Sequence, residues 1–150
     1  MSKIPTVSKF MTQQVHTVGI DQSLAKASKL MTELGIRHLP VLSQRQLVGV
    51  ISERDVLMLS SMKGIDPEVV AVEEALTADP YIVSPEAPLP DVCLHMAECK
   101  LGCVIICQDH KLVGILSWVD ALKALNALLP KELKPKAVVP WTCPAGYSSP

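Results

Sequence analysis

Two serine–aspartate pairs with the same spacing are the residues of this chain whose types and positions could do chemistry. Ser52 and Asp55 end the stretch GVISERD, and Ser117 and Asp120 end the stretch GILSWVD. In each stretch, apolar residues predict a strand that ends at the serine, where a helix begins. A serine at that position caps the helix, and the aspartate three residues later completes a capping box, which needs no ligand.

The same arrangement could also bind a ligand. A helix N-terminus offers backbone amide groups and a favourable dipole to an anion. The nearby carboxylate could accept hydrogen bonds from two neighbouring hydroxyl groups. A ribose phosphate satisfies both demands, so the residues alone leave the structural and the ligand-binding interpretations open.

The two pairs belong to a longer internal repeat. Residues 9 to 125 are one pattern written twice with an offset of 65 residues, so that Met31 corresponds to Met96 and Leu24 to Leu89. Each copy has an apolar face that it must bury on its twin. The repeat therefore predicts a pseudo-two-fold body with a cleft between equivalent edges and up to two related ligand sites.

Each copy is predicted to run strand, helix, strand, strand, helix, which is a mixed α/β (α+β) fold. The first helix of each copy carries an apolar stripe and is predicted to stop at a glycine, Gly35 or Gly102. Val7–Met11 and Val69–Leu76 are the lead-in segments, and Asp66 with the proline after it resembles a helix cap. The other predicted elements are Gln22–Leu34, His38–Leu42, Leu47–Ile51 and Glu53–Met62, then Ala87–Leu101, Val104–Cys107, Leu112–Leu116 and Trp118–Leu129.

Composition and charge restrict the class of protein. The chain has 150 residues, 49% of them apolar, and a net charge of −1. No apolar run approaches the ~20 residues of a membrane span. The lack of a basic stripe and the low aromatic content argue against nucleic-acid binding. The first five residues carry no apolar stretch of signal-peptide type, so we expect a cytoplasmic protein.

Four of the five cysteines lie in the second copy, and three of them continue a spacing of four from a histidine: His95, Cys99, Cys103 and Cys107. They would share a helix face only if the helix continued, whereas Val104–Ile106 predicts a strand. The chain has no Cys-x-x-Cys pair, the common spacing of metal sites. We therefore expect buried packing roles in a reducing compartment and no metal site.

Signatures of catalysis are missing from the sequence. It has no close pair of carboxylates, no nucleophile–base pattern and no Walker-type loop. We therefore expect a protein that is not an enzyme and uses no catalytic cofactor. Three hypotheses remain at this point: a ligand-binding regulatory module, a structural or interaction protein without a ligand, and an enzyme.

The element order and the motif Gly-h-h-Ser-x-x-Asp, written twice, resemble the cystathionine-β-synthase (CBS) domain in its tandem pair, the Bateman module. Gly35–Val41 (GIRHLPV) and Thr17–Asp21 (TVGID) share the resemblance, which covers residues 7 to 126. It implies two β-α-β-β-α units packed sheet to sheet. It also implies an adenosine ligand in the clefts, such as AMP, ADP, ATP, NAD(H) or S-adenosylmethionine. A homodimer of pairs would pass ligand occupancy to an effector protein.

The resemblance further implies that the aspartate of one copy faces the lead-in and the helix-to-strand turn of the other. Arg37 and His38 stand where the family often binds phosphate, which suits a planar guanidinium and a protonated imidazole. Taken alone, the same two residues favour a solvated turn at a helix C-terminus. The expected main cleft consists of Thr12, Val15, His16, Thr17, Ile36, Arg37, His38, Ser117 and Asp120.

A second, weaker cleft is expected around Asp55. Gly102 and Cys103 replace the basic pair there, and Arg54 could compensate in part. Trp118 is expected to pack at a module interface, with stacking on a base as the alternative. The expected second cleft consists of Ser52, Arg54, Asp55, Thr77, Pro80, Tyr81, Ile82, Leu101, Gly102 and Cys103.

The repeat divides the chain into residues 1–65, residues 66–129 and a proline-rich tail of residues 130–150. Five prolines exclude a continued helix in the tail. We expect the tail to be flexible. Its apolar segment Val138–Trp141 is a candidate contact for an effector protein.

Overall fold

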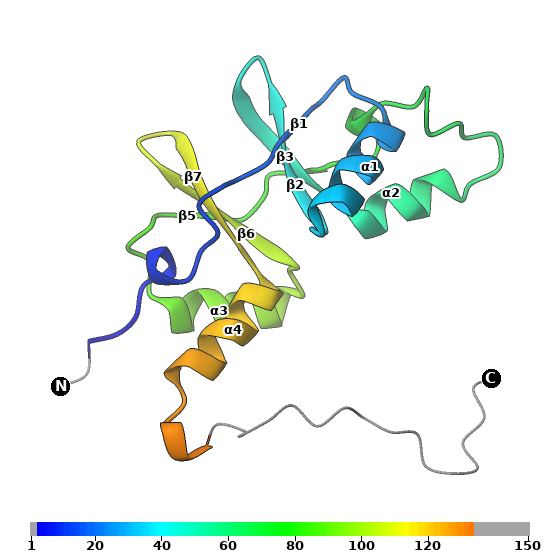
Figure 1. Cartoon of the computed structure of the whole chain (residues 1–150). Helices are drawn as coiled ribbons and strands as arrows, with labels where there is room; N and C mark the ends of the chain where they lie inside the picture. The colour runs from blue at the N-terminus through cyan, green and yellow to red at the C-terminus, as the bar shows by residue number, and fades with distance from the viewer. Residues whose placement is uncertain (1–2, 134–150) are drawn as a thin grey trace, which may run out of the picture.

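The structure is a computed structural model and describes residues 3 to 133 of the 150-residue chain. Within that range it contains four α-helices and two β-sheets, in the order that the repeat predicts. The two sheets lie next to each other in the middle of the molecule, and the helices of each unit lie on its outer side (Figure 1). The proposed effector segment around Trp141 lies outside the described residues.

The first unit contains a four-stranded sheet with the strand order β1-β2-β3-β4. Its strands are β1 (Val18–Gly19), β2 (His38–Ser43), β3 (Gln46–Ser52) and β4 (Thr77–Ala78), and its helices are α1 (Leu24–Leu34) and α2 (Glu53–Ser60). Strand β1 runs parallel to β2, whereas β2, β3 and β4 pair in antiparallel fashion.

The second unit repeats this plan with a three-stranded sheet of order β5-β6-β7. Its strands are β5 (Ile82–Val83), β6 (Cys103–Gln108) and β7 (Lys111–Ser117), and its helices are α3 (Leu89–Cys99) and α4 (Trp118–Leu128). Short 3₁₀ helices are η1 (Val7–Lys9), η2 (Val72–Glu74) and η3 (Lys131–Leu133).

Both predicted hairpins are confirmed. The turn in each hairpin is shorter than the one predicted from the sequence, because the strands extend further toward it. Gln44 and Arg45 connect β2 to β3 with φ angles of 49° and 67°, and Asp109 and His110 connect β6 to β7 with φ angles of 49° and 61°. Two consecutive residues with positive φ are typical of type I′ turns, whose twist matches that of the strands. The repeat therefore extends to the backbone conformation of its turns.

The predicted end of the α3 helix at Gly102 is wrong. Helix α1 ends at Gly35, which adopts the left-handed conformation as predicted, with φ of 64°. Helix α3 ends at Lys100, which takes the same conformation with φ of 55°. Lys100 stands at the position of Gly35 in the repeat, so the backbone geometry is kept although the glycine is not.

The helix cap predicted at Asp66 is also wrong. The Asp66 side chain accepts a hydrogen bond from the backbone N–H of Glu68 over 3.0 Å, and the backbone N–H groups of Val69 and Val70 bond to the Asp66 carbonyl. These contacts close a turn instead of opening an α-helix. The only helix in this lead-in is the three-residue η2.

The lead-in of each copy packs on the unit built by the other copy. Val7 is fully buried in the core of the second unit, and Val72 in the core of the first. Thr12 forms an antiparallel bridge to Ile115 in β7, and Thr77 pairs with Val50 in β3. Figure 1 shows the first lead-in running beside the second sheet before it reaches β1. This crossing brings residues of each lead-in next to the sheet of the other unit.

The glycine of each motif makes the crossing sterically feasible. A β-carbon on Gly49 would lie 2.5 Å from the Thr77 carbonyl oxygen, and one on Gly114 would lie 2.5 Å from Sδ of Met11. Real β-carbons do not approach other atoms this closely. A lead-in passes directly over each glycine, so any larger residue there requires the lead-in atoms beside it to shift.

Two apolar clusters form the core, one beneath each sheet. Leu24, Leu39 and Ile51 are fully buried in the first, as are Ile106 and Leu116 in the second. All of the buried core residues in the described range are apolar. Among the described residues, no helix has the length and apolar character needed to cross a membrane.

Candidate functional site

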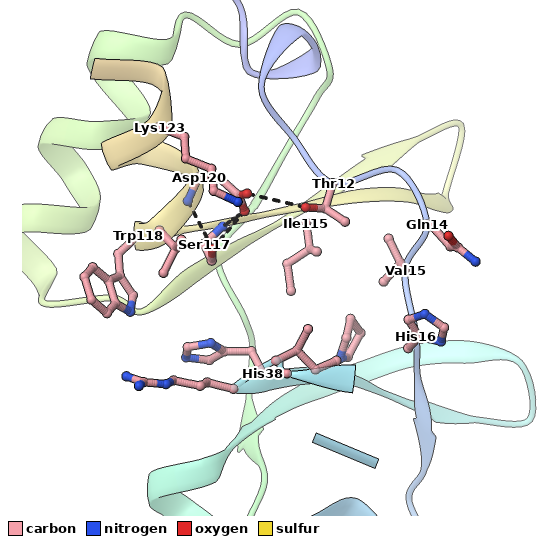
Figure 2. Close-up of a pocket in the computed structure, with 15 residues that line it drawn as sticks. Thr12, Gln14, Val15, His16, His38, Ile115, Ser117, Trp118, Asp120 and Lys123 are labelled. Atoms are coloured by element: carbon pink, nitrogen blue, oxygen red, sulfur yellow. Dashed lines mark hydrogen bonds between the residues drawn. The ribbon is translucent and has the colours of Figure 1, made fainter. Parts of the chain in front are cut away.

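A cavity of about 400 Å³ lies between the two units (Figure 2). Its walls come from the first lead-in, the turn between α1 and β2, the end of β7 and the start of α4. The lining residues are Thr12, Gln14, Val15, His16, Gly35, Ile36, Arg37, His38, Pro40, Ile115, Ser117, Trp118, Val119, Asp120 and Lys123.

The structure brings together eight of the nine residues expected in the main cleft, although they come from three distant parts of the sequence. Thr17 is the exception and is not among the lining residues. Figure 2 shows Thr12, Ser117 and Asp120 on one side of the cavity and His38 on the opposite side. Trp118 and His16 lie toward its two ends.

The predicted capping box at Ser117 is present. Strand β7 ends at Ser117, whose backbone is extended, with φ of −89° and ψ of 165°. Its N–H and its hydroxyl both donate to Oδ2 of Asp120 over 2.8 Å, and its Oγ accepts from the Asp120 N–H over 3.2 Å. One oxygen of the Asp120 carboxylate is thus committed to the cap.

The other oxygen of Asp120 is directed toward the first lead-in. The hydroxyl of Thr12 donates to Oδ1 over 3.5 Å, a long and weak hydrogen bond. Oδ1 can therefore exchange this partner for another donor without loss of the cap. The structural and the ligand-binding interpretations of the motif are compatible because they use different oxygens.

Arg37 provides an available positive charge at the mouth of the cavity. Its side chain is 65% exposed, and its Nε lies 3.7 Å from Oε2 of Glu53, which is 52% exposed. An ion pair this exposed stabilises the fold by less than about 1 kcal/mol. The guanidinium can therefore move to an anionic ligand at little cost.

His38 lies deeper in the wall and is partly buried. Burial lowers the pKa of His38 from its ordinary value of 6.5, and Arg37 lowers it further, while Asp55 and Glu53 oppose the shift. The surroundings of His38 thus favour the neutral imidazole over the charged form. An anion bound beside the ring would favour the protonated form.

The residues expected in the second cleft lie on several elements of both units. Ser52 and Asp55 form the matching capping box, in which the Ser52 hydroxyl donates to Oδ2 of Asp55 over 2.7 Å. Thr77 lies in β4, and Ile82 in β5 is exposed. The ring of Tyr81 packs against that of His95 at a centroid distance of 4.2 Å, with the ring planes tilted by 42°.

Two further second-cleft residues differ from the basic pair in burial as well as in charge. Cys103 is buried, and burial raises the pKa of its thiol to about 12. Gly102 has no side chain, and its backbone contacts the imidazole of His38. Arg54 is exposed on α2, and Pro80 and Leu101 are partly buried. No acidic or basic side chain therefore stands at the positions that mirror Arg37 and His38.

Sequence reasoning missed several lining residues. Lys123 is the most informative, because it adds a cation one helical turn after Asp120, and the i,i+3 spacing on a predicted helix could have revealed it. Trp118 was expected to pack at a module interface or to stack on a base; it lines the cavity and is 44% exposed, which leaves both roles open. The others that were missed are Gln14, Gly35, Pro40, Ile115 and Val119.

The four cysteines in the described range do not line the cavity, and the buried packing role expected for them is wrong for Cys99, which is exposed. Cys93, Cys99, Cys103 and Cys107 are free, and Sγ of Cys99 lies 3.7 Å from Nε2 of His95 one helical turn away. The described residues include no group of three or more His, Cys, Asp or Glu side chains placed to hold a metal ion.

Comparison with known proteins finds the same repeat. The model of the CBS domain family matches residues 7–61 and 72–127. The CBS domain-containing protein YhcV of Bacillus subtilis is 29% identical over 115 residues, which are 77% of this chain and 81% of YhcV. The chain is also 29% identical to an inosine-5′-monophosphate dehydrogenase of Korarchaeum cryptofilum, but spans only 24% of that enzyme.

The fold agrees with solved structures. CBSX2 in complex with AMP superimposes with a TM-score of 0.73 at 29% sequence identity, over 82% of this chain and 97% of that one. The crossing of the lead-ins and the paired sheets are thus features of a known architecture.

Proposed function

The chain belongs to the CBS domain family as a tandem pair, and on that basis we propose that it is a regulatory module that binds an adenosine-containing nucleotide. The observation that carries the proposal is the cavity beside Asp120. It combines a carboxylate oxygen that accepts only one long hydrogen bond, apolar walls and four basic side chains (His16, Arg37, His38 and Lys123) that come from both units. These features match the ribose, the base and the phosphate of one nucleotide.

We assign each part of the ligand to a part of the wall. Oδ1 of Asp120 accepts hydrogen bonds from the ribose hydroxyls in place of Thr12. Ile36 and Ile115 provide apolar surface for the base. Arg37 binds the phosphate, because a guanidinium forms bidentate hydrogen bonds to phosphate oxygens.

The second cleft has a lower affinity for phosphate in this proposal. Asp55 offers the same cap and carboxylate as Asp120, but Gly102 and Cys103 supply no positive charge. Arg54 on the exposed face of α2 is the cation that could compensate. The second cleft is therefore weak, empty or suited to a less charged adenosine ligand.

The assembly that we propose is a homodimer of pairs. Large apolar side chains on α2, just after it and on α4 are between 49% and 67% exposed, namely Leu57 and Met58, then Met62, then Leu122, Leu125 and Leu128. Leu57 and Leu122 are equivalent positions of the repeat, so the two helices present a similar surface. Two copies that meet through these helices would cover it, as expected of an exposed apolar patch.

We propose a sensor in the cytoplasm that performs no reaction and needs no catalytic cofactor. The alignment with YhcV, which extends over most of both chains, supports a stand-alone CBS pair. An effector protein would read the ligand-dependent packing of the two units, since a ligand shifts an equilibrium only by binding its states unequally. The alternative is a CBS pair that acts in protein interaction without binding a nucleotide.

A thermal-shift screen with AMP, ADP, ATP, NADH, S-adenosylmethionine and GTP tests the proposal. A ligand at 100 times its dissociation constant stabilises the fold by about 2.7 kcal/mol, which raises the melting temperature by several degrees. The expected result is a shift with one or more adenosine ligands and none with GTP. A folded protein that responds to none of them would favour the interaction role.

A further inference from the structure

One side chain, His38, lines the main cavity and also lies against Ser52 and Gly102, two residues expected in the second cleft. It begins β2 and lies opposite Ser52 in the register of β2 and β3, next to the hydroxyl that donates to Asp55. A β-carbon on Gly102 would lie 2.4 Å from Nε2 of His38, so the imidazole packs directly on the Gly102 backbone. The Gly102 carbonyl accepts a hydrogen bond from the Trp118 N–H over 3.1 Å, at the start of α4. His38 thus stands between the two capping boxes.

The repeat does not duplicate this contact. By the offset of 65 residues, Cys103 occupies the position of His38 and Arg37 that of Gly102. Even the methyl group of an alanine at position 102 would overlap the imidazole. Gly102 therefore differs from Arg37 in size as well as in charge, and its small size provides the space that the His38 side chain occupies.

We propose that the contact of His38 with Gly102 couples the two clefts, with Gly102 as a positioning residue for the phosphate end of the main cavity. Asp55 contributes the negative charge that supports a positive charge on His38 from the side of the second cleft. A ligand in the second cleft whose hydroxyl groups donate hydrogen bonds to Asp55 would weaken the electrostatic stabilisation of protonated His38 by the Asp55 carboxylate. Occupancy of one cleft therefore weakens binding in the other, and the effect is reciprocal.

The charges that surround His38 determine the sign of the coupling. Asp55 and Glu53 favour the protonated imidazole, whereas Arg37 and burial disfavour it. A phosphate bound beside the ring adds a negative charge, so that phosphate binding and protonation favour each other. Neutralising Asp55 should therefore weaken phosphate binding, but only as long as His38 is present.

A double-mutant cycle on AMP affinity, measured by calorimetry with the full chain at pH 6.5, tests the coupling. We expect Asp55→Asn to weaken AMP binding about 5-fold in the wild-type background, at the lower end of typical coupling energies. In the His38→Gln background it should change the affinity by less than about 2-fold. Glu86→Gln, which removes an exposed carboxylate at the opposite end of α3 from Gly102, is the matched charge control and should have no effect.

Gly102→Ala tests the steric part of the proposal. The added methyl displaces the far end of a flexible side chain, so the fold should survive while the imidazole leaves its place. We expect Gly102→Ala to weaken AMP binding as much as His38→Gln does, with no further loss when the two are combined. If Asp55→Asn does not fold, the comparison of Gly102→Ala with His38→Gln still tests the proposed coupling.

The inference rests on the proposed function, and the outcomes separate the two. Equal effects of Asp55→Asn in both backgrounds, or additive losses for Gly102→Ala and His38→Gln, overturn the coupling while AMP binding stands. Absence of binding of AMP and of every other adenosine ligand in the thermal-shift screen by the wild-type protein overturns the proposed function and the coupling together.

Discussion

The hydroxyl of Thr12 donates a hydrogen bond to Oδ1 of Asp120 over 3.5 Å, although 108 residues separate them along the chain. Thr12 is held at this position by backbone hydrogen bonds with Ile115 in β7, of 2.8 Å and 3.0 Å. Asp120 is held by the cap at Ser117. The lead-in of one copy and the helix start of the other thus build one site, which neither copy could form alone.

The crossing of the lead-ins predicts unequal effects of two equivalent substitutions. Gly49→Ala places a methyl group against the backbone carbonyl of Thr77, which cannot move without breaking β4, so we expect a destabilisation of about 1–3 kcal/mol. Gly114→Ala meets Sδ of Met11, whose flexible side chain can adapt, so the loss should stay below about 1 kcal/mol. Urea unfolding of both variants measures the difference. Equal losses would show that the two crossings are equally rigid.

His38 predicts a dependence of stability on pH. Its pKa in the folded protein is lower than the 6.5 of the free side chain, so the unfolded state binds more protons as the pH falls below that value. The stabilising contribution of neutral His38 is therefore complete above about pH 6.5 and is lost as the pH falls through the lowered pKa. Free energies of unfolding at pH 7.5 and pH 5.5 should differ less in His38→Gln than in the wild type. The same difference in both proteins would contradict the burial of His38.

The thiols of Cys99 and Cys103 should be alkylated at very different rates in the folded protein. Cys99 is exposed, whereas Cys103 is buried and has a thiol pKa of about 12, so its thiolate is scarce at pH 8. Alkylation by iodoacetamide at pH 8, followed by peptide mass spectrometry, should modify Cys99 first. Cys103 should react only after unfolding in guanidinium chloride. Comparable rates for the two thiols in the folded protein would be inconsistent with the packing of β6.

The proposed dimer surface predicts a change of mass in solution. Leu57→Glu combined with Leu122→Glu places charges on α2 and α4 and should convert a dimer into a monomer, as measured by light scattering after size exclusion. Leu94→Glu is the control, because Leu94 is 60% exposed on α3, outside the proposed interface. A wild-type protein that is already monomeric, or a control that also dissociates, would refute this assignment of the interface.

The sequence contained enough information to predict the element order and most of the main cavity. The repeat located both hairpins because apolar periodicity and polar turns were preserved at the offset of 65 residues. The capping boxes followed from the spacing of Ser117 and Asp120 alone. The meeting of Arg37 with Asp120 came from the family resemblance, since local patterns do not determine which unit a lead-in joins.

Other features depend on tertiary contacts and could not be predicted. Lys100 ends α3 in a conformation that glycine usually adopts, because the surrounding structure outweighs local preference. The lowered pKa of His38 requires its burial and its neighbours to be known. The role of Gly102 appears only when the imidazole that fills its space is seen.

The most direct test of the account compares AMP binding by the wild type, Asp120→Asn and Asp55→Asn in calorimetric titrations. The two variants are matched, because each removes the same charge from the third helical residue of a capping box. Melting temperatures of both should be recorded, since either change can cost about 1 kcal/mol of stability. We expect Asp120→Asn to lower AMP affinity at least about 10-fold, the loss of a hydrogen bond to a charged group, and more than Asp55→Asn does. A larger loss for Asp55→Asn, or equal losses, would contradict the assignment of the main site to the cavity beside Asp120.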